Sequence, residues 1–355
     1  MITGSEVRKP IEVAAAPTTI AREEARPDIP WEPRPEGLSE VLWRSSANPI
    51  LGRNPIPAGS CVYNSAVVPF GDGYAGVFRV DHKNLHPFLH VGWSDDGIRW
   101  RLEHGRIDFV GGGGQPVRPG FAYDPRVTLI DGEYVVTWCN DFHGPTVALA
   151  KTRDFHHFEY LGNAFVPFNR NGVLFPRRIG GRYAMLHRPS DDGHTPFGSI
   201  FMSRSPDLAY WGDHRLVMEP GGSGWWDGKK IGAGPVPIET DEGWLMIYHG
   251  VISTCNGYSY SVGAALLDLE EPWRVIARSG IYLLTPEADY EVTGRVPNIC
   301  FPCAALVDGG SGRLTLYYGA ADTCTAMAHG MVDEIVDFIK RHDCQGFGQQ
   351  PEDRR

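Results

Sequence analysis

Four cationic or imidazole side chains in the middle of the chain could together hold a dianion. They are Arg170, Arg188, Lys230 and His249. Guanidinium and ammonium groups donate charge-assisted hydrogen bonds to phosphate oxygens, and their positive field disfavours a general base nearby. Phosphate is itself a nucleophile and needs no base. This set therefore favours phosphorolysis over hydrolysis.

A second set of polar side chains suits a sugar. Carbohydrate sites use carboxylates, amides and aromatic rings, and the chain offers Asn64, Arg79, Tyr123, Asp124 and Asp322. A hydrolase acting on glycosides needs two carboxyl groups, one as acid and one as base or nucleophile. Besides Asp124, the candidates for the second group are Asp81, Asp141 and Asp322. A hydrolase therefore stays open as an alternative.

Each of these residues, taken alone, also has a structural explanation. Asp124 stands before Pro125, and an Asp-Pro pair often begins a turn. Asp322 could cap a turn, and Arg170 could lie in a solvated loop. If Asp124 is only a turn residue, the chain is a sugar-binding protein without catalysis. The functional interpretation requires that the residues meet at one place, which is a question about the fold.

Internal repetition predicts that fold. Five stretches each contain two β-rich runs around a tight glycine turn, near positions 73, 132, 180, 243 and 309. After each of the first four hairpins, a further turn is followed by an aromatic residue: Trp100, Phe158, Trp211 and Trp273. A period of roughly 50 to 65 residues with both markers in register is typical of four-stranded sheets arranged radially. A β-sandwich would show no such long period.

The sequence therefore predicts an all-β, five-bladed β-propeller with an N-terminal extended arm and a short C-terminal helix. We expect the arm over residues 1–40, the propeller over 41–330, and the helix and tail over 331–355. In a propeller the first strand of each blade lines the central channel, so ligand sites form where those strands end. The two polar sets occupy that position in the repeats and should meet around one axis.

Composition and charge exclude several classes of protein. Of 355 residues, 42% are apolar, with 43 glycines and 28 prolines, which indicates a large core and many turns rather than disorder. The formal net charge is −10, so nucleic acid and anionic membranes are poor partners. No stretch reaches the about 18 consecutive apolar residues of a membrane span. The N-terminus lacks the apolar core of a secretory signal.

The seven cysteines predict a cytoplasmic location, because an odd number of scattered cysteines is typical of free thiols. Cys300 and Cys303 have the spacing of a redox or zinc pair, but no second pair stands at zinc spacing. Buried structural thiols are the favoured interpretation. We expect no metal and no cofactor, with inorganic phosphate as co-substrate. Apolar residues of the arm and of the C-terminal helix could pack on a partner subunit, which leaves a homo-oligomer open.

Several long motifs resemble glycoside hydrolase family 130, the inverting β-mannoside phosphorylases with a five-bladed propeller. The matching stretches run from about Trp43 to the C-terminal helix and include Tyr63-Asn-Ser-Ala-Val-Val-Pro-Phe, Tyr123-Asp-Pro-Arg-Val-Thr, Pro167-Phe-Asn-Arg-Asn-Gly-Val-Leu-Phe-Pro-Arg-Arg, Met185-Leu-His-Arg-Pro-Ser, Lys230-Ile-Gly-Ala-Gly-Pro, Ile247-Tyr-His-Gly-Val and Tyr317-Tyr-Gly-Ala-Ala-Asp. The stretches Cys255-Asn-Gly-Tyr and Gly263-Ala-Ala-Leu-Leu-Asp together resemble the branch that cleaves 4-O-β-D-mannosyl-D-glucose.

The resemblance implies a role for each residue of the two sets. Asp124 matches the family's single general acid. The phosphate pocket is matched by Arg170, Arg188, Lys230 and His249, and positions around the mannose by Asn64, Arg79, Tyr123 and Asp322. It also implies that Asp124 protonates the glycosidic oxygen through the mannose 3-hydroxyl, while phosphate attacks the anomeric carbon from the opposite face with inversion. Family members that hydrolyse lack the basic set, which this chain keeps.

The substrate that this resemblance implies is 4-O-β-D-mannosyl-D-glucose, cleaved by phosphate to α-D-mannose 1-phosphate and D-glucose. The alternatives are β-1,4-mannooligosaccharides and mannosyl-N-acetylglucosamine. A β-mannosidase and a non-catalytic sugar-binding propeller also stay open. The loops at 111–115 and 221–226 are candidates for shaping the leaving-group site, and their sequences do not reveal which sugar they accept.

Overall fold

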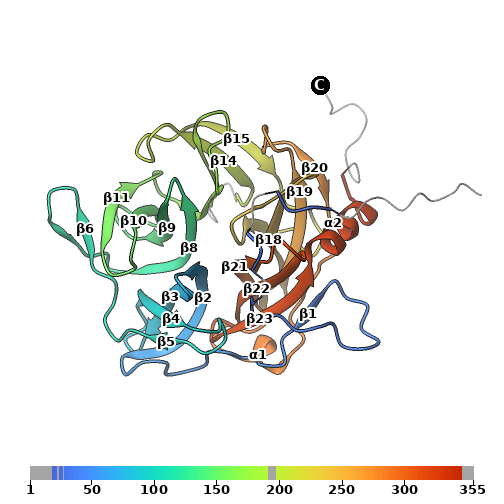
Figure 1. The fold of residues 1–355 in the computed structure, drawn as a ribbon, viewed down its shortest axis with the longest axis horizontal. Coiled ribbons are helices and arrows are strands. Elements are labelled where there is room, and N and C mark those ends of the chain that lie inside the picture. The colour runs from blue at the N-terminus through green and yellow to red at the C-terminus, as the bar shows by residue number, and fades with distance from the viewer. Residues whose placement is uncertain (1–17, 22–23, 27, 191–196, 346–355) are drawn as a thin grey trace, which may run out of the picture.

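Five sheets surround one axis as the blades of a propeller, which confirms the predicted fold class (Figure 1). The computed structural model describes residues 18–21, 24–26, 28–190 and 197–345. Residues 1–17 of the expected arm and 346–355 of the expected tail lie outside the described residues. Neither helix in the described part of the chain has the length and apolarity of a membrane span.

The strands of each blade follow one another outward from the axis. Blade one holds β2 (Gly59–Phe70), β3 (Gly73–His82), β4 (Pro87–Ser94) and β5 (Arg101–Leu102). Blade two holds β8 (Ala122–Ile130), β9 (Glu133–Asn140), β10 (Thr146–Thr152) and β11 (Phe158–Asn163), and its outer edge carries β6 (Phe109–Gly111) and β7 (Pro116–Val117). Blade three holds β12 (Asn169–Leu174), β13 (Tyr183–Pro189), β14 (Ile200–Ser205) and β15 (Gly212–Met218).

The last two blades depart from the simple pattern. In blade four the inner strand is split into β16 (Lys230–Ala233) and β17 (Ile238–Thr240), both paired with β18 (Gly243–Thr254), and β19 (Gly257–Leu267) and β20 (Val275–Arg278) follow. Blade five holds β21 (Cys300–Val307), β22 (Arg313–Ala320) and β23 (Cys324–Met331). Its outermost strand is β1 (Leu42–Arg44), which precedes blade one in the sequence. The two ends of the propeller are thus joined by backbone hydrogen bonds.

The second sequence marker of the repeats is a local turn. A Ser/Thr-x-Asp triplet accepts hydrogen bonds from the following backbone N–H groups in three blades, at Ser94-x-Asp96, Thr152-x-Asp154 and Ser205-x-Asp207. Short polar side chains at turns satisfy backbone donors in this way. The indole of Trp100 and that of Trp211 donate to a carbonyl in the same turn, at 3.0 Å each. The tryptophan that follows the turn therefore stabilises the turn's backbone conformation.

The core lies between the blades. Five hydrophobic clusters each join two neighbouring blades, so every blade is packed on both faces. The C-terminal helix α2 (Val332–Arg341) belongs to the cluster between blades four and five. Its apolar residues Val332, Ile335, Val336 and Ile339 are fully buried in this chain. They are therefore not available to a partner subunit, contrary to the expectation.

The described part of the arm crosses one end of the axis. Thr19 hydrogen-bonds Asp241 in the β17–β18 turn, and Gly309 in the β21–β22 turn donates to Glu24. A cavity of about 410 Å³ lies at this end, lined by Glu24, Arg26 and inner segments of all five blades. Ile29 is buried against blades one and five. The polar residues singled out above lie toward the opposite end of the inner strands.

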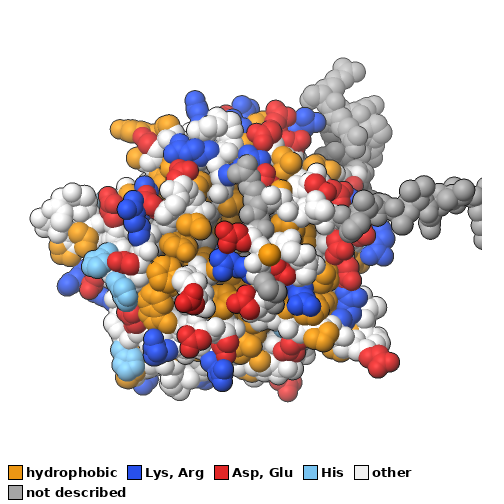
Figure 2. All heavy atoms as spheres, viewed as in Figure 1, with side chains coloured by type: hydrophobic (Ala, Val, Ile, Leu, Met, Phe, Trp, Pro, Cys, Tyr) orange, Lys and Arg blue, Asp and Glu red, His pale blue; other side chains and the backbone are white. Residues whose placement is uncertain are grey.

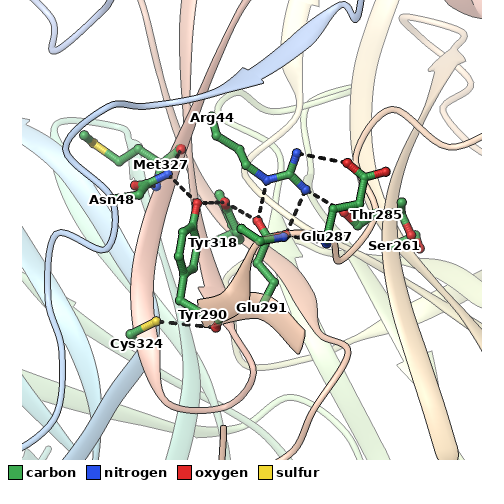
Figure 3. A network of polar contacts seen from close by, with 11 residues as sticks. Arg44, Asn48, Ser261, Thr285, Glu287, Tyr290, Glu291, Tyr318, Cys324 and Met327 are labelled. Atoms are coloured by element: carbon green, nitrogen blue, oxygen red, sulfur yellow. Dashed lines mark hydrogen bonds and ion pairs between the residues drawn. The ribbon is translucent and has the colours of Figure 1, made fainter. Parts of the chain in front are cut away.

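A buried carboxylate holds the connection between blades four and five (Figure 3). Glu291 lies in the short helix α1 (Asp289–Val292), and its side chain is 0% exposed. Its carboxylate accepts two hydrogen bonds from the Arg44 guanidinium at 2.8 Å and one from the Tyr318 hydroxyl at 2.7 Å. The backbone N–H groups of residues 287 and 288 also donate to it. This network fixes the segment that carries Arg295 toward the axis.

Glu291→Gln should therefore lower the free energy of unfolding at pH 7 by about 3 kcal/mol, because the amide nitrogen of glutamine cannot accept the hydrogen bonds that Arg44 and two backbone N–H groups donate to Oε2, and the buried negative charge that faces Arg44 is lost. Although burial opposes ionisation, hydrogen bonds from Arg44 and the backbone lower the pKa of Glu291. Its contribution is thus present above the pKa of the unfolded chain and lost as the pH falls through the lower folded pKa. Urea unfolding at pH 7 and pH 4 should show the difference shrinking at low pH. The 65%-exposed neighbour Glu287 supplies the control Glu287→Gln, which should change little.

Candidate functional site

The inner strands of blades one to three share a bulge that aims side chains at the axis. The pairing register shifts at Tyr63/Ala66, at Tyr123/Arg126 and at Arg170/Val173. Each bulge holds one residue in the left-handed region, namely Asn64 (φ +50°), Asp124 (φ +53°) and Asn171 (φ +53°). Asn and Asp adopt this conformation more readily than other residues with a side chain. Bulges near functional sites re-aim side chains, which is what these three do.

Asp124 receives two hydrogen bonds on the same oxygen. Its Oδ1 accepts from Asn64 Nδ2 and from Arg79 Nη1, both at 2.8 Å. The side chain is 13% exposed. Among the described residues none donates a hydrogen bond to Oδ2. That oxygen is therefore available to a bound ligand.

Arg79 links Asp124 to a buried second carboxylate. Its Nε donates to Asp81 Oδ1 at 3.0 Å, and its guanidinium lies over the Tyr63 ring, 4.2 Å from the centroid. Asp81 also accepts from the Tyr63 hydroxyl at 2.9 Å and pairs with Arg295. Asp81 is therefore occupied as the partner of two guanidinium groups, and its side chain is only 2% exposed. It is poorly placed to serve as the second carboxyl group of a hydrolase.

The arginines predicted for phosphate lie side by side next to this group. Arg170 and Arg188 are directly paired across β12 and β13. Arg170 donates from Nε to the Tyr123 hydroxyl at 3.0 Å, and Arg188 donates from Nη1 to the carbonyl of Ile231 at 3.2 Å. No described carboxylate forms an ion pair with either one. Burial lowers the pKa of Arg188, and the neighbouring Arg170 lowers it further. Two adjacent guanidinium groups that form no ion pair among the described residues are suited to an anion.

His249 is an uncharged member of this cluster. It is fully buried, and its Nε2 lies 3.0 Å from Arg188 Nη1. Since an arginine can only donate, Nε2 is the acceptor and the imidazole is neutral. Burial, followed by the charges of Arg188, Arg126 and Lys230, holds the pKa of His249 well below its ordinary value. His249 therefore orients Arg188 rather than adding a positive charge.

Lys230 lies at the start of β16, beside two tyrosines of the long β18–β19 hairpin. Its Nζ is 4.8 Å from the ring centroid of Tyr258 and 5.6 Å from that of Tyr260. Burial raises the pKa of Tyr260 to about 12, and the charges of Arg188, Asp322 and Asp124 also act on it. Tyr260 therefore lies between the cations and the carboxylates. Tyr260 was not predicted as a site residue, and the only local signal for it is its position two residues after Tyr258.

The structure thus brings all nine predicted residues into one network. Asp322, at φ +47°, completes it, since its charge interacts with Arg79, Asp124 and Asp81. Two other residues from the same strand ends stay outside. Asp141 accepts a hydrogen bond from the backbone of Gly120 at 2.9 Å, and His187 is buried between Asn169 and Ser203. His187 is on the opposite face of β13 from Arg188, because successive side chains alternate.

The two loops that the sequence suggested for the leaving-group site lie in blades two and four. The 111–115 loop is the tip of the β6–β7 hairpin at the outer edge of blade two, away from the axis of this chain (Figure 1). Trp226 in the 221–226 loop stacks on Tyr248 at 5.6 Å, within blade four. The described residues contain no group of three or more metal-ligating side chains. Acidic and basic side chains are interspersed over the face in Figure 2, without a broad basic area among the described atoms.

Asp322→Asn should raise the free energy of unfolding at pH 7.5 by about 1–2 kcal/mol, while lowering kcat/KM. Burial raises the pKa of Asp322 to about 6, from an ordinary value of 3.8, and Asp124 and Asp81 add to the shift that Arg79 opposes. The folded protein therefore binds this proton more tightly than the unfolded chain. The resulting stability is present below about pH 4 and is lost as the pH rises through 6.

Urea unfolding at several pH values tests this expectation. The gain from Asp322→Asn should shrink toward pH 4, where wild-type Asp322 is protonated. A difference that is the same at pH 4 and pH 7.5 would show that ionisation of Asp322 is not its cause. Asp72→Asn, in the exposed β2–β3 turn, is the matched control and should change neither stability nor its pH dependence.

Comparison with known proteins agrees with this geometry. The sequence profile of glycoside hydrolase family 130, described as β-1,4-mannooligosaccharide phosphorylase, matches residues 22–341. A β-1,4-mannooligosaccharide phosphorylase of Ruminococcus albus is 51% identical over 332 residues, covering 92% of this chain and 98% of that protein. A 4-O-β-D-mannosyl-D-glucose phosphorylase of Bacteroides fragilis is 29% identical over 338 residues, covering 86% and 83%.

The fold has solved counterparts as well. A β-1,2-mannobiose phosphorylase from Listeria innocua, in complex with β-1,2-mannobiose, matches with a TM-score of 0.74 at 28% identity. The match covers 84% of this chain and 99% of the other. The similarity therefore extends over the propeller as a whole.

Proposed function

The chain belongs to glycoside hydrolase family 130 and is a β-mannoside phosphorylase, and we propose that its substrates are β-1,4-linked mannooligosaccharides. The products are then α-D-mannose 1-phosphate and a chain shortened by one sugar. The higher identity to the Ruminococcus albus enzyme supports this substrate over mannosyl-glucose, which the sequence motifs had favoured. Mannosyl-glucose is kept as the second candidate, because the Bacteroides fragilis enzyme is also similar over most of the chain.

The adjacent guanidinium groups of Arg170 and Arg188 are the observation that supports phosphate as the second substrate. Their paired positions and the absence of an ion-paired carboxylate among the described residues leave two positive charges together. A phosphate dianion neutralises both and can accept bidentate hydrogen bonds. Lys230 adds a third cation at the end of β16. This charge distribution favours phosphate over water as the nucleophile.

Asp124 supplies the proton in the proposed reaction. Its Oδ2 gives a proton to the mannose 3-hydroxyl, which passes its own proton to the glycosidic oxygen as the bond to the anomeric carbon breaks. A phosphate oxygen attacks that carbon from the opposite face, so that the configuration inverts. Asn64 and Arg79 hold Oδ1 at 2.8 Å and thereby orient the proton-bearing oxygen. The proton count balances over one cycle: the shortened chain leaves with the proton that Asp124 gave up, and the proton that hydrogen phosphate loses on becoming the dianion of mannose 1-phosphate restores the Asp124 carboxyl group.

Incubation with β-1,4-mannobiose, β-1,4-mannotriose and mannosyl-glucose, each with and without phosphate, tests the proposal. We expect phosphate-dependent release of mannose 1-phosphate, seen as the α anomer by NMR, with a higher kcat/KM for the mannooligosaccharides. Release of free mannose without phosphate would show a hydrolase. Binding without turnover would show a non-catalytic propeller. A higher kcat/KM for mannosyl-glucose would favour the second candidate.

We further propose that the reaction needs neither a metal ion nor a cofactor, because phosphate is the nucleophile and Asp124 the acid. Full activity after dialysis against EDTA would support this, and activity restored only by a divalent cation would contradict it.

A cytoplasmic location is proposed from the seven free thiols. Self-association is proposed through surfaces other than the buried face of α2, and light scattering measures it directly.

A further inference from the structure

Arg126 breaks the pattern of the repeated inner strand. It is the first residue after the bulge in blade two, and the equivalent residues in blades one and three are Ala66 and Val173. All three are at most 1% exposed. Blades one and three thus have a small or apolar side chain at this buried position. In blade two, the guanidinium group of Arg126 occupies the same position in the core. Burying a guanidinium in a core is strongly destabilising unless hydrogen bonds or an opposite charge compensate for its lost hydration.

The Arg126 guanidinium is held by backbone carbonyls alone. Nε donates to Gly234 at 2.5 Å, Nη1 donates to Pro125 at 3.0 Å and to Asp124 at 3.3 Å, and Nη2 is 3.4 Å from the carbonyl of Pro302. These carbonyls come from blades two, four and five. No described carboxylate forms an ion pair with Arg126. The carbonyl dipoles solvate the cation, but its net charge remains.

The field of Arg126 reaches the predicted phosphate site. Its guanidinium lies 5.6 Å from the ring centroid of Phe301, and that ring stacks on His249 at 4.3 Å. His249 in turn accepts from Arg188. Arg126 is also among the charges that lower the pKa of His249. Along this path, only the ring of Phe301 and the neutral imidazole of His249 separate the buried cation from Arg188.

We propose that Arg126 is a positioning residue that acts on phosphate through its charge and on Asp124 through the backbone. The buried charge stabilises a dianion above it without touching it, and the hydrogen bonds to residues 124 and 125 hold the bulge that presents the general acid. This role rests on the proposed phosphorolysis.

Two substitutions separate the charge from the hydrogen bonds. Arg126→Gln keeps donors for the carbonyls but removes the charge, and Arg126→Lys keeps the charge. The control is Arg177→Met. Arg177 is also mostly buried and stacks on Trp244 at 5.0 Å, but it is paired with Glu239 and Glu270. We expect Arg126→Gln to raise the KM for phosphate about 10-fold, and Arg126→Lys and Arg177→Met to leave it within about 3-fold.

Competing anions give a readout that a purely structural role would not produce. Removing a charge changes the binding free energy of a dianion twice as much as that of a monoanion. The fold-change in the inhibition constant of the dianion is therefore the square of the fold-change for the monoanion. In Arg126→Gln the inhibition constant of sulfate should rise about 10-fold and that of nitrate about 3-fold. Equal changes for the two anions, or a folded Arg126→Gln with unchanged phosphate KM, would overturn the inference.

The outcome stays decisive if Arg126→Gln does not fold. Arg126→Lys then carries the test, because it should keep the wild-type ratio of sulfate to nitrate inhibition. A loss of sulfate inhibition in this charge-conserving variant would overturn the inference. A wild-type enzyme whose turnover does not depend on phosphate would instead overturn the proposed function.

Discussion

Asp124→Asn is expected to lower kcat for phosphorolysis of mannobiose roughly 10³-fold, within the range that a general acid contributes. Asparagine retains an oxygen that can accept from Asn64 and Arg79, and it tolerates the φ of +53° at this position. The fold and the binding of sugar should therefore persist. What is lost is the carboxyl group that the proposed reaction uses as its proton donor. Steady-state kinetics with saturating phosphate, together with a thermal unfolding scan, measure both.

A substrate whose leaving group needs no proton makes this test specific. With 2,4-dinitrophenyl β-mannoside, the bond breaks without acid assistance, so Asp124→Asn should retain most of the wild-type rate. An equal loss on both substrates would contradict the role as an acid and favour a role in binding. Asp141→Asn is the matched control. Asp141 also lies just beyond an inner-hairpin strand of blade two, but it holds the backbone of Gly120 at 2.9 Å.

The fold could be predicted from the sequence because its signals are local. Each glycine turn and each Ser/Thr-x-Asp turn is made by residues close together in the chain, and the aromatic residue that follows bonds within the same turn. Five copies of the glycine-turn hairpin predict a closed ring whatever the details of packing. The convergence of nine polar residues then follows from topology, because equivalent positions of inner strands face one axis.

The rest depends on contacts between segments that are distant in the sequence. Arg295 reaches Asp81 across 214 positions, and nothing in its neighbourhood indicates that partner. Phosphate binding by His249 stays a prediction, and only the geometry shows that its Nε2 faces the donor Arg188 and so must accept. The arm and α2 were expected to offer apolar residues to a second subunit. The amphipathic pattern of α2 was predicted correctly, but the pattern does not say which surface covers it.

The anomaly at Arg126 was visible in the sequence but could not be interpreted there. Asp-Pro-Arg is an ordinary stretch until the bulges align it with Ala66 and Val173. Only then does the arginine stand where a small apolar residue belongs. Aligning the inner strands of a repeat protein by their bulges, rather than by their turns, therefore shows which blade has been modified for function.

Arg188→Met is expected to raise the KM for phosphate about 10²-fold, because it removes a buried donor that forms charge-assisted hydrogen bonds of roughly 1.5–3 kcal/mol each. The KM for the mannoside should change little, since Asp124, Arg79 and Asn64 remain in place. Arg188 is 5% exposed, and it has no described ion-pair partner. Methionine also relieves its repulsion with Arg170, so the protein should remain folded. Sulfate, which raises the wild-type melting temperature by binding the same cations, should no longer do so.

Arg204→Met separates this effect from the general loss of an arginine in blade three. Arg204 lies on β14, pairs with Asp213 at 3.4 Å and stacks on Trp273 at 4.6 Å, away from the axis. We expect it to leave the KM for phosphate unchanged. If Arg188→Met keeps the wild-type KM for phosphate and still gains stability from sulfate, the anion is bound elsewhere. The paired guanidinium groups would then have to be explained by the sugar, whose hydroxyl groups do not neutralise two adjacent charges.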